Sequence, residues 1–321
     1  MNNYLQDLKL QIKARAARLG FPLCGVTDPQ PPVEYSRYTD WLAKGYHAGM
    51  AYLDTEYHRS VRKDSARLFP SVRSIIVLGF PYRLTTRHEM DQTGAGVICG
   101  YAVGEDYHQR IPRLLEPLVE FLHESSPDDI RPRVFTDSAP ILERELASRA
   151  GLGWIGRNTC LISPSLGSAL LLAEIFTDLP LEPDTPEKRD LCGTCDRCIG
   201  ACPTACILPD RMIDANRCIS YHSIENKGEI PADLATRFTN QVFGCDICQV
   251  VCPWNHFSPA TEPRQGSENL IPVKELAELL EISQPVFNER FAETPVARLK
   301  KDGFTRNLYI VSEKLHSKNR D

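Results

Sequence analysis

The order of apolar and polar positions predicts alternating helices and strands over the first 180 residues. Apolar residues recur every three or four positions from Leu5 to Leu19, and Gly20 follows where such a helix would end. Another helix is expected near 111–123. Short apolar runs with β-branched residues predict buried strands at 74–82, 133–137, 159–164 and 168–178. This mixture indicates an α/β (α+β) domain with a central sheet.

The segment that follows the expected strand 133–137 has the signals of a helix start. Residues 138–151 are predicted to form a helix that ends at Gly151. Pro140 fits its first turn, and Asp137 or Ser138 would be its N-cap. On this interpretation alone, Asp137 has a structural role.

Composition changes in the second half of the chain. Residues 179–190 carry three prolines and six charges, which is typical of a linker. A cysteine-rich stretch follows, and helical spacing returns near Val273. The predicted regions are therefore an α/β domain at 1–180, a cysteine-rich domain at 181–262 and a helical region at 263–321.

The overall composition is that of a globular protein. Hydrophobic residues make up 42% and charged residues 25%, with a net charge of −5, which argues against a chain that binds nucleic acid over its whole surface. The amino end lacks the apolar run of a signal peptide. The most apolar run, 168–176, is too short for a membrane span and contains Glu174. We expect a cytoplasmic monomer without membrane contact.

The cysteines carry the clearest chemistry. The chain has 12, and most lie between Cys192 and Cys252. A C-x2-C-x2-C-x3-C-P motif starts at Cys192, and a C-x2-C-x3-C-P motif starts at Cys245, with Cys218 available as its missing member. These spacings are typical of a ferredoxin-like domain with two [4Fe–4S] clusters, in which the cysteine before each proline binds the other cluster. Cys206 lies outside the pattern and is expected to be a small buried residue.

This symmetry predicts two ligand sets. The first is Cys192, Cys195, Cys198 and Cys252, and the second is Cys202, Cys218, Cys245 and Cys248. The alternative is a pair of structural zinc sites, which also use paired C-x2-C units. Zinc sites do not need the third cysteine or the C-P ending, so iron–sulfur clusters are favoured.

Longer motifs resemble the epoxyqueuosine reductase family over most of residues 60–256. The similar stretches are YAVGEDYH (101–108), FTDSAPILERELASRAGLGWIGRNTCLISPSLGS (135–168), LCGTCDRCIGACPTACI (191–207), RCISYHSIENKG (217–228) and FGCDICQVVCPWN (243–255). The resemblance implies a nitroreductase-like α/β domain that binds base-off cobalamin against the ferredoxin module. It also implies reduction of epoxyqueuosine to queuosine at the wobble position of tRNA, with an external electron donor.

The resemblance also implies roles for single residues. The family's proton donor matches Asp137, whose carboxyl would then need a pKa raised by burial to be protonated at neutral pH. The helix cap is the structural alternative. Cobalamin contacts would come from Arg62, Cys99, Asp137, Leu161, Leu172, Ser220, Cys245 and Asp246. Of these, the apolar residues and Cys99 could equally be core, and Arg62 a solvated charge. Tyr107 and His108 are candidates for lining the substrate cleft.

The carboxyl end resembles only the start of the helical-repeat tail found in many family members. Residues 294–321 hold seven Lys or Arg against three Asp or Glu, which suits either phosphate contact or a solvated helix face. The expected tRNA contacts are Lys227, Arg298, Lys300, Lys301 and Arg306. Two other functions stay open at this point. One is an electron-transfer protein without its own substrate, and the other is an enzyme like the corrinoid reductive dehalogenases.

Overall fold

The computed structural model describes residues 3–90, 95–126, 128–255 and 270–318. An antiparallel four-stranded sheet lies at the centre of the amino-terminal part. Its strands, in sheet order, are β1 (Leu23–Thr27), β2 (Ser74–Pro81), β7 (Leu170–Thr177) and β4 (Arg133–Phe135). The helices that cover it are α1 (Asn3–Arg18), α5 (Tyr107–Glu124) and α6 (Glu143–Arg149).

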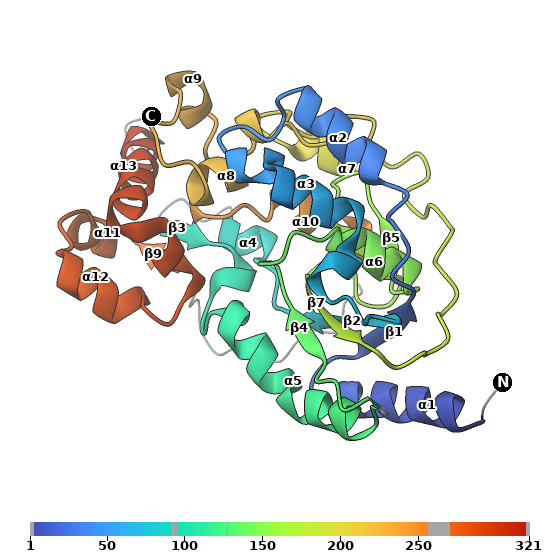
Figure 1. Ribbon diagram of the computed structural model, residues 1–321. Coiled ribbons are helices and arrows are strands. Elements are labelled where there is room, and N and C mark those ends of the chain that lie inside the picture. Colours follow the sequence, from blue (N-terminus) through green and yellow to red (C-terminus); the bar gives the residue numbers. More distant parts are fainter. Residues whose placement is uncertain (1–2, 91–94, 127, 256–269, 319–321) are drawn as a thin grey trace.

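The side chains of β2 alternate between the two faces of this sheet because successive residues of a strand point in opposite directions. Ile76 and Leu78 belong to the core that α1 and α5 cover, whereas Ile75 and Val77 belong to the core that α6 covers. Figure 1 shows α1 and α5 on one side of the sheet and α6 on the other. Both faces of the sheet are buried at β2, which explains why the sequence of this strand is an unbroken apolar run.

A second, three-stranded sheet joins distant parts of the chain. Its strands are β3 (Ala95–Ile98), β8 (Gln241–Phe243) and β9 (Leu270–Pro272). β3 lies in the middle, parallel to β8 and antiparallel to β9. Each of the three regions expected from the sequence therefore contributes one strand.

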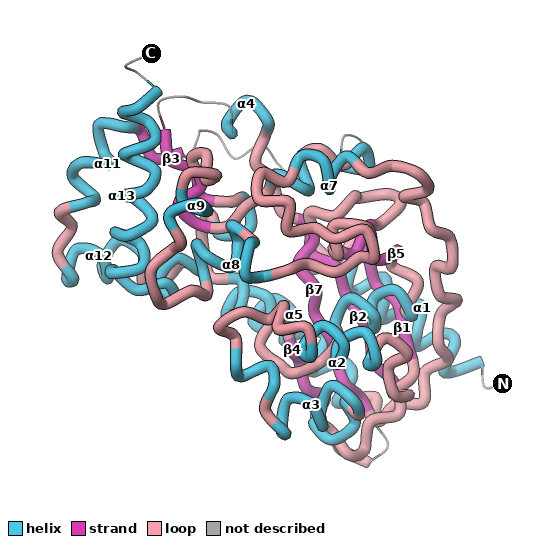
Figure 2. Tube along the Cα trace, turned by 90° about the horizontal axis from the view of Figure 1, so that it is seen from above, coloured by secondary structure: helices cyan, strands magenta, loops and turns pink. Residues whose placement is uncertain are grey.

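The carboxyl-terminal helices pack against this second sheet. They are α11 (Val273–Leu280), α12 (Gln284–Phe291) and α13 (Lys300–Lys318). The 3-10 helix η6 (Pro295–Leu299) lies between α12 and α13. Figure 2 shows the three α-helices side by side, away from the amino end. The buried Asn307 ties α13 to the rest of the molecule, because its Nδ2 donates to the carbonyls of Ser223 (2.9 Å) and Val242 (2.8 Å).

Short helices make up much of the rest. Those of the cysteine-rich part are α7 (Arg197–Ala201), α8 (Ile219–Ile224), α9 (Ala232–Ala235) and α10 (Ile247–Val250), with η4 (Ala215–Arg217) and η5 (Pro253–Asn255). The others, with the remaining strands, are α2 (Tyr35–Ala43), α3 (Glu56–Lys63), α4 (Arg87–Met90), η1 (Ala51–Asp54), η2 (Ser65–Leu68), η3 (Gly100–Ala102), β5 (Trp154–Ile155) and β6 (Leu161–Ile162). Within the described ranges, every helix is too short or too polar to cross a membrane.

Most of the expected elements are present, but several boundaries differ. The strands expected at 133–137 and 159–164 are shorter, as β4 and β6, and two helices begin elsewhere. α5 begins at Tyr107, four residues before the expected start, because Asp106 caps it by accepting from the backbone N–H of His108. α6 begins at Glu143, so the prediction that a helix starts at 138 is wrong. Residues 136–142 form an irregular loop, and Asp137 therefore does not cap a helix.

Candidate active site

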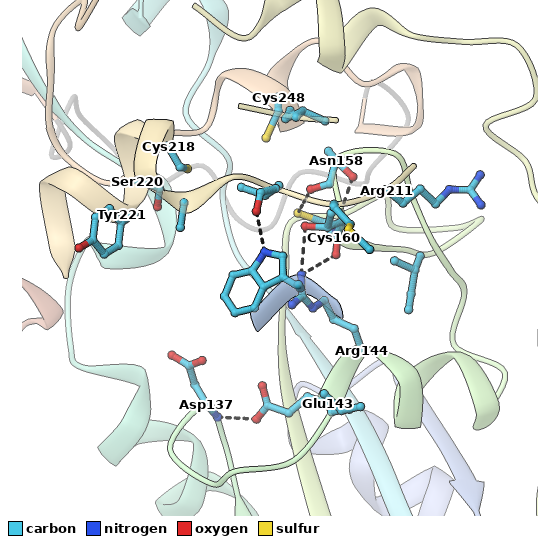
Figure 3. Close-up of a pocket in the computed structure, with 18 of the residues that line it drawn as sticks. Asp137, Glu143, Arg144, Asn158, Cys160, Arg211, Cys218, Ser220, Tyr221 and Cys248 are labelled. Carbon is cyan, nitrogen blue, oxygen red and sulfur yellow. Dashed lines mark hydrogen bonds between the residues drawn. The ribbon is translucent and has the colours of Figure 1, made fainter. Parts of the chain in front are cut away.

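A cavity of about 1310 Å³ separates the loop that follows β4 from the cysteine-rich part. Its walls come from α2, α3, the loop 136–142, α8, α10 and η6. Figure 3 shows Asp137 and Glu143 on one side of the cavity and Cys218, Ser220 and Cys248 on the other. The two predicted chemistries, proton transfer and sulfur ligation, therefore face one space.

The carboxylate of Asp137 is held by two neighbours on α5. The hydroxyl of Tyr107 donates to Oδ2 of Asp137, and Nε2 of His108 lies 3.3 Å from the same oxygen. The backbone of Asp137 has a φ of 53°, a left-handed conformation that aspartate tolerates better than most residues. Its N–H donates to Oε1 of Glu143 over 2.6 Å. The loop is thus fixed at both its backbone and its functional carboxylate.

His108 continues this contact away from the cavity. Its Nδ1 lies 2.6 Å from Oδ1 of Asp106, and Nε of Arg298 donates to Oδ2 of Asp106 over 3.4 Å. The His108 side chain is only 10% exposed. A row of alternating acidic and basic side chains therefore runs from Asp137 through His108 and Asp106 to Arg298.

These contacts determine the protonation of the row. Burial by the cavity walls raises the pKa of Asp137, but the hydrogen bonds from His108 and Tyr107 lower it by a larger amount. The net pKa therefore lies below the ordinary value. The expectation of a raised pKa at Asp137 is therefore wrong. Burial lowers the pKa of His108, yet its bonds to Asp137 and Asp106 outweigh this and raise it. The contacts therefore favour a carboxylate at Asp137 beside an imidazolium at His108.

Two further carboxyls lie under the Asp137 loop. Glu174, in the middle of β7, is fully buried, and burial together with the charge of Glu143 raises its pKa well above the ordinary value. Burial and the charge of Asp137 raise the pKa of Glu143 to about 7. The two glutamates therefore share at least one proton at neutral pH, because two adjacent buried carboxylates repel each other.

The arrangement of the cysteines is compatible with the two predicted ligand sets. In the first group, burial and the nearby Cys192 and Cys195 raise the pKa of Cys252, and burial together with Cys192 and Cys252 raises that of Cys198. Cys160, which belongs to neither set, also lies near Cys248 and Cys252. The second group, whose members line the cavity, is Cys202, Cys218, Cys245 and Cys248.

Cys206 lies nearer to the second group than its position outside the motif suggests. It is 3% exposed, as expected for a small core residue, and its Sγ is 3.4 Å from Sγ of Cys202. The Cys206 thiol also forms a hydrogen bond with the thiol of Cys218. A fifth thiol therefore packs against two of the predicted ligands.

Five of the predicted cobalamin contacts line the cavity, and three do not. The five are Arg62, Asp137, Ser220, Cys245 and Asp246. The guanidinium of Arg62 lies 5.3 Å above the ring of Tyr38, so Arg62 is not a freely solvated charge. The carboxylate of Asp246 is 3% exposed and accepts from the backbone N–H of Gly100 over 2.9 Å.

The other three predicted contacts are not among the residues that line this cavity. Cys99 (2% exposed) and Leu161 (4%) lie in apolar cores behind the cavity wall. Leu172 belongs to β7, and its carbonyl accepts from Oγ1 of Thr136 over 2.7 Å. Leu172 therefore supports the Asp137 loop from behind.

The predicted tRNA contacts separate into three places. Lys227 and Arg298 line the main cavity, whereas Lys300 and Lys301 line a smaller one between α12 and α13. Arg306 has a structural role instead, because Nη1 donates to the carbonyls of Asn226 (2.8 Å) and Gly228 (2.6 Å) and Nη2 to that of His222 (2.8 Å).

Three residues of the site are not predicted from the sequence. Asp106 and Glu143 lie within motifs but have no assigned role, and Glu174 stands out only as a charge in an apolar run. The signal for Glu174 is that charge itself, since a carboxyl within a strand that is buried on both faces needs a reason to be there. Asp106 and Glu143 give no comparable signal.

Comparison with known proteins gives two family matches. Residues 191–255 match the model described as a 4Fe-4S double cluster binding domain, and residues 62–138 match the one described as Epoxyqueuosine reductase QueG, DUF1730. The chain is 41% identical to the epoxyqueuosine reductase of Cyclobacterium marinum, over 94% of this chain and 95% of that one. It is 38% identical to that of Leadbetterella byssophila, over 96% and 100%.

Solved structures agree with these matches. One is an epoxyqueuosine reductase with an epoxyqueuosine-modified tRNA-Tyr stem loop, at a TM-score of 0.84 and 29% identity, covering 97% of this chain and 82% of that one. Another is the epoxyqueuosine reductase from Streptococcus thermophilus, at a TM-score of 0.84 and 26% identity, covering 98% and 83%.

Proposed function

The chain belongs to the epoxyqueuosine reductase family, and from this premise we propose that it reduces epoxyqueuosine in tRNA to queuosine. The observation that supports this most is the shared cavity, in which Asp137 faces the second group of cysteines. Reduction of an epoxide to an alkene consumes two electrons and two protons and releases the oxygen as water. A site for this reaction needs an electron source and an acid on opposite sides of the substrate.

The residues fit the two kinds of cofactor that this chemistry needs. Two groups of four thiols are the donor sets of two [4Fe–4S] clusters, and we assign the groups described above as their ligands. The cavity exceeds the roughly 300–1,000 Å³ of drug-sized pockets, as a site for a ligand as large as cobalamin requires. When bound, the clusters would supply single electrons and cobalamin a strongly reducing cobalt centre.

The chain's own groups would hold the cofactor and handle the protons. Arg62, Ser220 and Asp246 line the part of the cavity that we assign to cobalamin. Asp137 would protonate the epoxide oxygen as the carbon–oxygen bond breaks, and Glu143 would keep the Asp137 backbone in position. A bound nucleoside would exclude water from Asp137, which would strengthen its contacts with His108 and Tyr107.

The RNA contact is proposed in two parts. Lys227 and Arg298 would meet phosphates beside the inserted nucleoside, because both line the main cavity. Lys300 and Lys301 would meet phosphates farther along the stem. Proteins read RNA most readily through unstacked loop bases, which suits an anticodon loop entering this cavity.

The test is a turnover assay on anaerobically purified protein. It is incubated with cobalamin, a low-potential chemical reductant and an anticodon stem-loop that carries epoxyqueuosine. We expect mass spectrometry of the nucleosides to show loss of one oxygen, dependent on both additions. Absence of queuosine from protein with full iron and bound cobalamin would refute the proposal. An electron-transfer protein without its own substrate would give that same negative result.

A further inference from the structure

The proposed reaction needs a proton that Asp137 does not hold at rest. The epoxide oxygen must be protonated as it departs, whereas the bonds to Asp137 keep its carboxylate ionised. Asp137 faces the cavity, and its side chain is 57% exposed there before substrate enters. A bound nucleoside would cover it, so this proton must come from within the protein.

His108 is the neighbour with the geometry to hold that proton. Its two ring nitrogens meet two carboxylates, Oδ1 of Asp106 at 2.6 Å and Oδ2 of Asp137 at 3.3 Å. A neutral imidazole has one N–H and can donate to only one of them, but an imidazolium donates to both. The two carboxylates therefore favour the doubly protonated ring.

Resting on the proposed function, we infer that His108 is the proton reservoir that charges Asp137 during turnover. The Nε2–H bond of His108 breaks and an O–H bond forms at Oδ2 of Asp137, and Asp137 passes this proton to the epoxide oxygen as the carbon–oxygen bond breaks. The second proton, which completes the water molecule, comes from solvent. His108 is left neutral and still donates through Nδ1 to Asp106, and solvent restores its proton after the product leaves. The two electrons come from the external donor.

The charged groups around His108 are consistent with this role. Asp106 lies on the start of its own helix and Asp137 on the loop after β4, while Arg298 approaches from η6. Arg298 opposes the positive charge of His108. Burial raises the pKa of Asp106, but its bonds from His108 lower it by more, with a smaller contribution from Arg298. Asp106 and Arg298 are therefore positioning residues, which act through His108.

Two other neighbours of Asp137 are less suited to the task. Tyr107 donates to Asp137, but burial and the charge of Asp137 raise the pKa of Tyr107, so its hydroxyl does not release a proton. Glu143 accepts from the backbone N–H of Asp137, which is a contact with the wrong atom for proton delivery. His108 alone among these three meets the carboxylate with a proton it can give up.

The test compares His108→Gln with the matched control His123→Gln. His123 lies at the other end of the same helix, where its Nε2 is 3.0 Å from Oδ1 of Asp129. The single-turnover rate of the wild-type protein should fall as pH rises through the raised pKa of His108, above 6.5. In His108→Gln we expect a rate about 10²-fold lower, with the falling limb moved to lower pH, where Asp137 itself titrates. His123→Gln should retain the wild-type profile.

A second variant separates the loss of the His108 proton from misfolding. Asp106→Asn keeps an oxygen to cap α5 but removes the charge that stabilises the imidazolium, so its falling limb should also move to lower pH. A limb that stays at the wild-type pH in both variants would overturn the inference.

A readout without turnover separates this inference from the proposed function. In protein labelled with ¹⁵N-histidine, the signal lost in His108→Gln should report a doubly protonated ring at about pH 7, where an ordinary histidine is mostly neutral. A singly protonated His108 would overturn the reservoir even if the wild-type protein makes queuosine. Failure of the proposed function would appear instead as wild-type protein that makes none.

Discussion

The two walls of the cavity hold different reactive groups. On the cysteine-rich wall, burial raises the pKa of the Cys248 thiol, whereas a hydrogen bond from Cys206 lowers that of Cys202 to about 5. Metal ligation needs both thiols in the deprotonated form. On the opposite wall, bonds from His108 and Tyr107 keep Asp137 ionised. One wall is thus suited to hold metal clusters and the other to store and move protons. Separate walls allow substrate to receive electrons and protons from different directions.

The largest effect should come from removing a predicted cluster ligand in the cysteine-rich part. Cys198→Ala removes one member of the first thiol group, and we expect iron to fall from about eight atoms per chain to roughly half, with activity abolished. Metal analysis of anaerobic protein measures this. The matched control is Cys24→Ala, a cysteine in β1 outside both groups. Stoichiometric zinc with little iron in the wild-type protein would contradict the assignment of both groups.

A smaller effect should come from loosening the loop that carries Asp137 without changing the Asp137 carboxylate. Glu143→Ala removes the acceptor of the Asp137 N–H, so a loop with a left-handed residue loses its support. We expect kcat to fall about tenfold as the loop samples other positions. Glu143→Gln keeps an oxygen at the same place and should lose less than half of that effect. Equal losses in the two variants would mean that the charge of Glu143 matters, not its hydrogen bond.

The contrast between the walls also explains what could be predicted from the sequence. Cluster ligands lie within short motifs, so the spacing around Cys192 and Cys245 predicts both groups without knowledge of the fold. The state of Asp137 depends on Tyr107 and His108, about 30 residues earlier, and on Arg298, far along the chain. Such contacts are made by tertiary structure, and they reversed the expected direction of its pKa.

The boundary of α6 shows the same limit. Pro140 and the helix-forming residues after it predict an early start. The loop 136–142 is instead held by two hydrogen bonds, from Oγ1 of Thr136 to the carbonyl of Leu172 on β7 and from the N–H of Asp137 to Glu143. Local propensity is a weak signal where side chains from other elements bond to the backbone. The strand β2, buried on both faces, is by contrast predicted well because its apolar run is itself the cause of its burial.

The smallest effect concerns the RNA surface outside both walls. Reversing Lys300 and Lys301 to Glu should weaken binding of the stem-loop several-fold and flatten its dependence on salt, because phosphate contacts release counterions. Reduction of the clusters should not change. A titration at several salt concentrations measures this, with Lys274→Glu on the neighbouring α11 as the control. Equal binding by the double variant and the wild type would remove this surface from the RNA interface.

The separation of the two walls is tested most directly by one single-turnover experiment on Asp137→Asn. The variant and the wild type are loaded with cobalamin, reduced, freed of excess reductant and mixed with the epoxyqueuosine stem-loop. Asparagine keeps the shape but cannot deliver a proton, so we expect the variant to show the wild-type spectrum of reduced cofactors and to form product about 10²–10⁴-fold more slowly. Product formation at the wild-type rate, or loss of the reduced spectrum before mixing, would contradict the account.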